Sequence, residues 1–250
     1  MIWWHAALIF VAGIGAGTIN TVVGSGTLIT FPTLVALGVP PVTANVSNTV
    51  GVFPGSLVGA WGYRRELSGQ GHRAARLSAA SITGAIVGAI LLLTLPASAF
   101  DAIVPVLIIL AILLVIFGKR LTALLSRTGH QPRGNVTPLL WVLTFGTGIY
   151  GGYFGAAQGV LLMGLFGLML AEPIQRQNGL KNLLAGMVNL VAAIVFVATT
   201  HIDWTAAGLI ALGSIIGGLI GARVGRRLSP PALRAVIVVV GLIAVVKLLV

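Results

Sequence analysis

The sequence contains no cysteine and only four acidic residues among its 250 residues. The absence of cysteine excludes disulfides, thiolate metal sites and thiol catalysis. Each acid lies at the border of an apolar run, so none stands out as a buried proton relay, a sodium ligand or half of a catalytic acid pair. The histidines are scattered without metal-ligand spacing, and no convincing Ser/His/Asp set is present. We therefore expect no enzymatic activity, no metal site and no cofactor. The four acids are Glu66, Asp101, Glu172 and Asp203.

Charged residues of either sign are also scarce. They make up 8% of the chain, whereas 57% of the residues are hydrophobic and the mean hydropathy is +1.06. Apolar runs such as 78–95, 101–118, 183–200 and 206–222 approach or reach the roughly 20 residues that carry a helix across a hydrocarbon core. The sequence therefore predicts an all-α, multi-pass integral membrane protein embedded in the lipid bilayer. Its apolar start lacks the features of a signal peptide, so we expect it to be the first membrane segment.

The charge that is present is mostly positive, with 15 Lys and Arg residues and a net charge of +11. These cations occupy short loops between apolar runs, and no basic, aromatic-bearing soluble segment accompanies them. The charge therefore indicates membrane topology, and we expect no nucleic-acid partner.

The chain resembles itself at one fixed offset, which pairs Gly26 with Gly159 and is therefore 159 − 26 = 133 residues. Matches of scarce residue types at this repeat offset indicate an internal duplication. The offset also pairs Pro40 with Pro173, Asn45 with Asn178, Ser81 with Ser214, and Gly88-Ala89 with Gly221-Ala222. The duplication divides the chain into a first transmembrane repeat (1–118), a cytoplasmic linker (119–137) and a second transmembrane repeat (138–250), which together form one membrane domain.

Each repeat contains about five apolar segments, and an odd number inverts the second repeat relative to the first. The predicted segments are 3–22, 26–38, 42–62, 74–95 and 99–118, followed by 138–155, 159–171, 178–200, 204–222 and 232–250. The loop charges agree with inversion. Arginines 64, 65, 73 and 76 follow the third segment of the first repeat, whereas arginines 223, 226, 227 and 234 follow the fourth segment of the second. The positive-inside rule then places both termini outside the cytoplasm.

The first and second segments of each repeat meet at a join without any charge. The first join contains Gly24, Ser25, Gly26 and Thr27, and the second contains Gln158 and Gly159. Segment 26–38 has about 13 residues, or roughly 20 Å as a helix, which is short for a full crossing. We interpret each pair as a re-entrant hairpin whose tip lies inside the membrane, although a simple packing turn remains an alternative. Backbone N–H groups at the start of the short helix would form an uncharged anion site.

Polar residues recur at helical spacing in the segments that follow. Asn45, Asn48 and Thr49 share one helical face and form the first stripe. At the repeat offset their partners are Asn178, Lys181 and Asn182, which form the second stripe. The two stripes predict a lined cavity between the repeats, and the alternative is ordinary hydrogen bonding between helices. Lys181 has two open interpretations: it snorkels or pairs with Glu172, or it faces an anionic ligand.

Two stretches carry a family resemblance. "GAGTINTVVGSGTLITFPTLVALGVPPVTANVSNTVG" resembles the first signature of the TauE/SafE sulfite exporter family, and "GSIIGGLIGARVGRRLSPPALRAVIVVVGLIAVVKLL" is similar to its C-terminal end. The resemblance implies a secondary transporter of the bacterial inner membrane for small sulfur-containing or carboxylate anions, such as sulfite, sulfoacetate or other organosulfonates. By position, Gly24 and Gly26 match the glycine-rich turn, and Asn48 matches the asparagine of a Thr-Asn signature. The sequence departs from that pattern at Ser25, Ser47 and Thr49.

The leading hypothesis is alternating-access transport of a small anion held between the two hairpin tips and the two stripes. An anion channel and a non-transport membrane scaffold or accessory subunit are the alternatives. A coupling ion, either a proton or sodium, and a homodimeric assembly are compatible with the transporter hypothesis.

Overall fold

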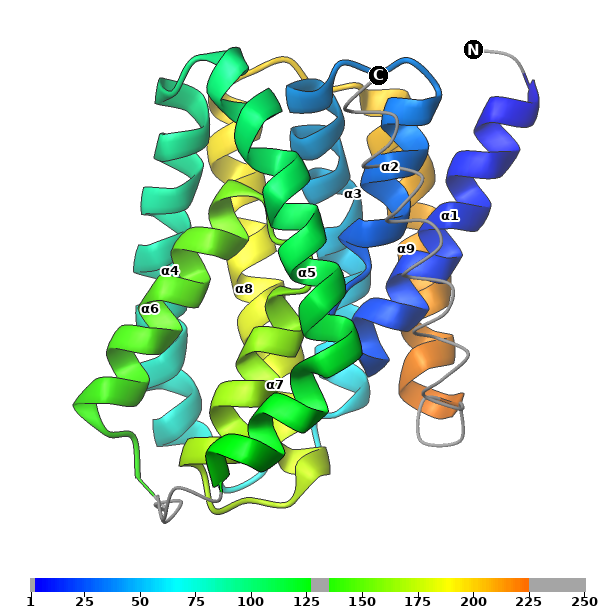
Figure 1. Ribbon diagram of the computed structural model, residues 1–250. Helices are drawn as coiled ribbons and strands as arrows, with labels where there is room; N and C mark the ends of the chain where they lie inside the picture. The colour runs from blue at the N-terminus through cyan, green and yellow to red at the C-terminus, as the bar shows by residue number, and fades with distance from the viewer. Residues whose placement is uncertain (1–2, 127–134, 225–250) are drawn as a thin grey trace.

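The protein is a bundle of helices in its computed structural model, which describes residues 3–126 and 135–224 (Figure 1). The predicted all-α fold is confirmed. The helices are α1 (Trp3–Val22), α2 (Thr27–Ala36), α3 (Pro41–Gly62), α4 (Gly71–Thr94), α5 (Ala97–Ser126), α6 (Pro138–Tyr153), α7 (Gln158–Met169), α8 (Ile174–Thr199) and α9 (Trp204–Val224). The predicted tenth segment, 232–250, lies outside the described residues.

Five of these helices, α1, α4, α5, α8 and α9, are long and apolar enough to cross a membrane. This confirms the membrane class that the composition predicts. Two helices are much shorter: α2 has 10 residues and α7 has 12. At about 1.5 Å per residue they span roughly 15 and 18 Å, well below the roughly 30 Å of a hydrocarbon core. Their length is compatible with the re-entrant interpretation, which stays a prediction.

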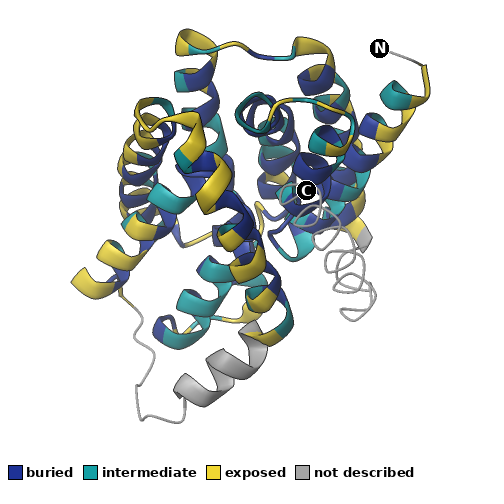
Figure 2. Ribbon diagram, turned by 45° about the horizontal axis from the view of Figure 1, so that its top comes forward, coloured by how far each residue is buried: buried dark blue, intermediate teal, exposed yellow. Residues whose placement is uncertain are grey.

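The bundle has an apolar core that also encloses polar side chains, and its outer surface is rich in large apolar side chains. Asn48 and Lys181 are fully buried, whereas Val106, Val142 and Leu212 are about 60% exposed. Figure 2 shows exposed residues along the outer faces of the peripheral helices and buried residues toward the middle of the bundle. Apolar side chains on the outside are at no disadvantage in lipid, so this distribution agrees with a membrane-embedded bundle.

The two repeats interlock in the bundle. Helix α1 packs against α9, and α6 packs against α4. At the repeat offset α1 corresponds to α6 and α9 to α4, so the first helix of each repeat packs on the fourth helix of the other. The α1–α2 hairpin enters from the end of the bundle where the N-terminus lies, and the α6–α7 hairpin enters from the opposite end (Figure 1). The orientation of either repeat relative to the membrane stays a prediction.

One predicted helix end is wrong. Helix α5 continues through Ser126, beyond the predicted segment 99–118. The assignment of 119–137 as a cytoplasmic linker stays a prediction. The stretch after residue 118 is rich in Leu, Ala, Lys and Arg, which favour a helix, and Gly129 is the first residue in it that commonly stops one. At the other end of the linker, α6 begins at Pro138 as predicted, and the Thr137 hydroxyl accepts a hydrogen bond from the Leu140 amide at 3.1 Å.

Glycines set the separation of the paired helices. A Cβ on Gly84 or Gly88 of α4 would fall on the α6 backbone, at Phe145 and Ile149 respectively. A Cβ on Gly148 of α6 would in turn lie 2.6 Å from the Ser81 carbonyl oxygen. Because lipid is as apolar as the side chains, close backbone packing of this kind takes the place of a hydrophobic driving force.

Substitution of Gly148 by Ala should push α4 and α6 apart, because the added methyl group meets backbone that cannot rotate away. Overpacking of this type costs about 1–3 kcal/mol, and we expect a clearly lower melting temperature of the purified protein. Gly146→Ala is the matched control, since a Cβ two residues earlier on the same helix meets nothing within 4 Å. Equal melting temperatures for the two variants would contradict the packing argument.

Candidate functional site

The two hairpin tips touch each other inside the bundle. We call residues 23–27 the first tip and residues 154–159 the second tip. The Gly159 amide donates a hydrogen bond to the Gly24 carbonyl oxygen at 3.0 Å. Gly24 has a φ of +91°, a conformation that favours glycine, and a Cβ there would fall on the Gly159 backbone. Both positions therefore need glycine for the tips to approach.

The short helices α2 and α7 begin at these tips, so the positive ends of two helix dipoles lie close to the contact. Ser25 and Gln158, which correspond at the repeat offset, are 1% and 3% exposed. A Cβ on Gly26 would lie 2.4 Å from the Ala16 carbonyl oxygen of α1, so Gly26 packs against α1. The tips thus bring Gly24 and Gly159 into contact, and Ser25 and Gln158 are buried next to them.

Each stripe holds the end of the other repeat's first helix. In the first stripe, the Asn45 Nδ2 donates to the Tyr153 carbonyl oxygen, the last residue of α6, at 2.9 Å. In the second, the Nδ2 atoms of Asn178 and Asn182 donate to the Thr21 carbonyl oxygen of α1, at 3.4 and 3.1 Å. The last carbonyls of a helix lack partners within the helix. The amide nitrogens of both stripes therefore satisfy the two helix ends that lead into the tips.

Lys181 also donates hydrogen bonds to the end of α1, through its ammonium group. It is fully buried, and its Nζ donates to the carbonyl oxygens of Asn20 at 2.9 Å and Thr21 at 3.1 Å. Snorkelling and pairing with Glu172 are therefore both wrong for this side chain. The ammonium group lies at the negative end of the α1 dipole, and its Cδ is 3.0 Å from where a Gly159 Cβ would stand. Lys181 thus places a positive charge beside the contact between the tips.

Asn48 and Thr49 are bonded within their own repeat. The Asn48 Nδ2 donates to the Thr27 Oγ1 at 3.3 Å, and the Asn48 Oδ1 accepts a short hydrogen bond from the Thr30 hydroxyl. Asn48 therefore fastens the first turn of α2 to α3. The Thr49 hydroxyl bonds back to the Asn45 carbonyl oxygen at 3.0 Å. For these residues, hydrogen bonding between and within helices accounts for the side-chain partners seen in the structure.

Five polar atoms in this region are buried without any partner among the described residues. They are the Ser25 Oγ, the Gln158 Nε2, the Asn45 Oδ1, the Asn178 Oδ1 and the Tyr153 Oη. The first four form two pairs at the repeat offset, Ser25 with Gln158 and Asn45 with Asn178. Buried polar atoms are nearly always hydrogen-bonded to protein, water or a ligand. A repeated set of unbonded atoms at both tips therefore marks a place where a small polar species can bind.

Some residues of the site are not predicted from the sequence. Asn20, Thr21 and Tyr153 offer backbone carbonyl oxygens to the stripes, a role that any residue type could fill. The Tyr150 hydroxyl closes the second tip by donating to the Ala156 carbonyl oxygen. Asn20 could have been found from the sequence, because it corresponds to Tyr153 at the repeat offset. In the structure its Nδ2 donates to the Ser56 Oγ at 2.8 Å.

A charged network joins the two repeats at one end of the bundle. Glu172, in the turn between α7 and α8, accepts from the Arg73 Nη1 at 2.7 Å and from the Arg176 Nε at 2.6 Å. The Arg176 Nη1 also donates to the Ser68 carbonyl oxygen at 3.1 Å. The pKa of Glu172 lies below its usual range. The main cause is the hydrogen bond from Arg73, and the hydrogen bond from Arg176 and the two positive charges act in the same direction. This network ties the α3–α4 turn to the α7–α8 turn.

The chain is similar to known membrane transporters over nearly its whole length. Residues 9–248 match the family described as Sulfite exporter TauE/SafE. The "Probable membrane transporter protein ORF9" of Sinorhizobium sp. is 28% identical over 247 residues, which cover 97% of this chain and 92% of the relative. The "Probable membrane transporter protein YfcA" of Escherichia coli K12 is 26% identical over 243 residues, covering 97% of this chain and 88% of the relative. No solved structure matches.

Glu172→Gln should destabilise the protein at pH 7 and remove part of its acid sensitivity. A carboxylate with a lowered pKa stabilises the fold above its unfolded value of about 4.3, and this contribution is lost as the pH falls further. Loss of the charge-assisted bonds should cost about 1–2 kcal/mol. Melting temperatures at pH 7 and pH 3.5 measure both effects. Asp101→Asn, at an exposed position of α5, is the control with the same charge change, and an equal effect there would contradict the proposed role of the network.

Proposed function

The chain belongs to the sulfite exporter TauE/SafE family, and we propose that it is a secondary transporter of a small sulfur-containing or carboxylate anion. The family consists of membrane transporters, and five helices of the chain are long and apolar enough to span a bilayer. In this proposal the protein lies in the bacterial inner membrane with both termini outside the cytoplasm. Sulfite, sulfoacetate and other organosulfonates are the substrates to test first.

The observation that carries the proposal is the repeated set of unbonded polar atoms at the tips. The Ser25 hydroxyl and the Gln158 amide can donate hydrogen bonds to an anion. The N-termini of α2 and α7 add partial positive charge, and Lys181 adds a full one. Neither of the ion pairs among the described residues involves Lys181, so a carboxylate does not neutralise it there. One buried cation and several neutral donors suit a singly charged anion.

The acceptor atoms of the site refine the substrate class. The Oδ1 atoms of Asn45 and Asn178 need hydrogen-bond donors. A fully deprotonated anion offers none, whereas an acidic oxyanion such as hydrogen sulfite, or an anion accompanied by water, does. The proposal therefore favours a monoanion that carries a hydroxyl group or enters with a bound water molecule.

The mechanism we propose is alternating access, in which one repeat rocks against the other around the tips. The tips meet through the backbone bond between Gly159 and Gly24, so a small relative movement would expose the unbonded atoms on one side. The charged network at Glu172 would close the bundle at its own end. At the repeat offset Glu172 and Arg73 correspond to Val39 and Ala206, so the opposite end would be closed by apolar contacts instead.

Saturable transport in proteoliposomes distinguishes a carrier from the alternatives. A carrier preloaded with substrate exchanges it for labelled substrate against the net gradient, whereas a channel does not. A scaffold or accessory subunit moves no anion at all. Counterflow of radiolabelled sulfite, measured beside sulfoacetate and a simple carboxylate, is therefore the first experiment, and a lack of counterflow with all three would contradict the proposal.

Ser25→Ala should weaken transport without weakening the fold. Loss of one hydrogen bond to the anion corresponds to about 1 kcal/mol, or about a fivefold higher KM in the counterflow assay. Ser81→Ala is a matched control, because the Ser81 Oγ is also buried and unbonded but lies where α4 packs on α6. An equal loss of transport in both variants would argue against a substrate contact at Ser25.

Gln158→Glu should impair transport more severely than loss of a hydrogen bond. The substitution keeps the shape of the side chain, which packs against Gly151, but it places a negative charge where the anion would bind. Like charges in contact are strongly unfavourable, so we expect uptake to fall at least about tenfold. The melting temperature of the variant provides the control for folding. Unchanged uptake by a folded variant would exclude the second tip as the anion site.

A further inference from the structure

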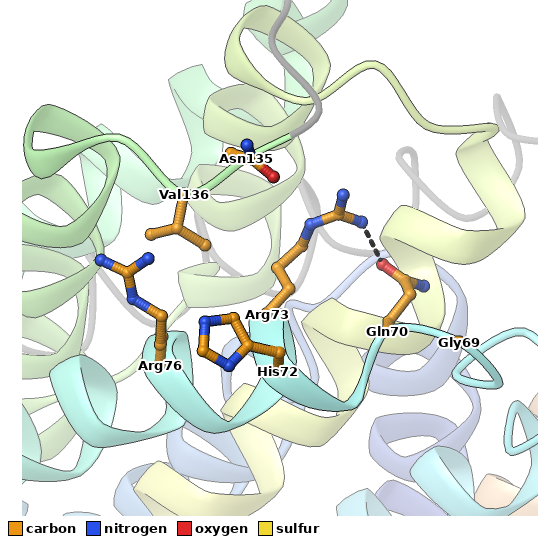
Figure 3. A pocket seen from close by; sticks show the side chains of 7 residues that line it. All are labelled: Gly69, Gln70, His72, Arg73, Arg76, Asn135 and Val136. Carbon is orange, nitrogen blue, oxygen red and sulfur yellow. Dashed lines mark hydrogen bonds between the residues drawn. The ribbon is translucent and has the colours of Figure 1, made fainter.

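A basic pocket lies at the end of the bundle that carries the charged network, away from the hairpin tips. Its volume is about 490 Å³, within the range of small-molecule sites. Figure 3 shows that α4 supplies one wall and the chain just before α6 supplies the other. The lining residues are Gly69, Gln70, His72, Arg73, Arg76, Asn135 and Val136.

The pocket gathers positive charge without an acid in its lining. Figure 3 shows the guanidinium groups of Arg73 and Arg76 on either side of Val136. The Arg73 Nη1 donates to the Gln70 Oε1 at 2.7 Å and shares its charge with Glu172 outside the pocket. Arg76 is exposed and takes part in neither of the ion pairs among the described residues. Its charge is therefore available to an anion that enters the pocket.

Two helix N-termini add to this charge. Helices α4 and α6 begin at Gly71 and Pro138, next to the lining residues, and pack closely side by side. Their positive dipole ends therefore both lie at the pocket. At the repeat offset Arg73 and Arg76 correspond to Ala206 and Leu209, so the equivalent place in the other repeat lacks these cations.

An apolar, lipid-facing surface begins directly beside the pocket. Leu139 and Val142, in the first turns of α6, are 54% and 58% exposed. Ile86 and Ile90 extend the exposed apolar surface along α4. A ligand with a phosphate at the Arg side chains and hydrocarbon chains along α4 and α6 would match both surfaces. Basic pockets between transmembrane helices on the cytoplasmic side bind anionic lipid headgroups in this way.

We propose that this pocket binds the phosphate group of an anionic phospholipid, with Arg76 and Arg73 as its cationic contacts and the acyl chains against α4 and α6. The site is separate from the proposed substrate site at the tips. It lies at the end that the loop charges assign to the cytoplasm, where membrane lipids are frequently anionic.

Binding to the purified full-length chain in detergent tests this proposal. Native mass spectrometry would measure retention of phosphatidylglycerol and, for comparison, of zwitterionic phosphatidylcholine with the same acyl chains. We expect the wild-type protein to bind phosphatidylglycerol in preference to phosphatidylcholine. Arg76→Ala should bind phosphatidylglycerol about fivefold more weakly, because each Lys or Arg near an anionic lipid surface strengthens binding by about that much. Arg76→Lys keeps the charge and should retain most of the binding. Arg65→Ala is the matched control, since Arg65 is exposed in the turn between α3 and α4 but does not line the pocket.

Other outcomes would overturn the proposal in different ways. An equal loss in Arg65→Ala and Arg76→Ala would assign the lipid preference to the general charge of this end of the protein. Tight binding of soluble glycerol phosphate or inorganic phosphate, competing fully with the lipid at equal concentration, would assign the pocket to a free phosphate compound. Equal retention of the two lipids would exclude headgroup recognition. Each result is independent of whether the protein transports sulfite.

Discussion

The hydrogen bonds at the ends of α1 and α6 are the interactions on which the centre of the molecule depends. A helix that ends inside the bundle, away from water, leaves carbonyl groups that need other donors. Here the donors come from the opposite repeat: Asn45 reaches Tyr153, and Lys181 reaches Asn20 and Thr21. The glycine break at each tip and the polar stripe of the other repeat are therefore one structural unit. Neither would be stable in this environment without the other.

The same arrangement leaves some buried polar atoms without a hydrogen-bond partner among the described residues. An asparagine that donates its amide nitrogen to a helix end still carries a carbonyl oxygen, and in Asn45 and Asn178 that oxygen is buried and unbonded. Ser25 and Gln158 add unbonded atoms from the tips themselves. The capping of the ends of α1 and α6 thus leaves unused hydrogen-bonding capacity on the stripes, in addition to that of the tips.

The sequence predicts the membrane class, most helix positions and the two stripes, because hydropathy and the spacing of scarce polar residues record them directly. It also nominates Ser25 and Gln158 through the repeat offset. It does not predict where Lys181 points, because the partners of this side chain are backbone carbonyls, which have no residue signature. It misplaces the end of α5 for a related reason, since a helix that leaves an apolar segment can continue through polar residues of high helix propensity.

The ends of the bundle differ in a way that the duplication alone does not explain. At one end Glu172 joins Arg73 to Arg176, and the corresponding residues of the other repeat are Val39, Ala206 and Thr43. The side chains of these ion pairs are only 13–31% exposed, so salt screens them much less than it screens pairs on an open surface. If the repeats rock as proposed, closure at the charged end involves these ion pairs. Closure at the other end involves packing and the hydrogen bond from the Asp203 amide to the Ser47 Oγ at 2.9 Å. The two closed states therefore need not be equally stable, even though the helices around the tips are related by an internal repeat.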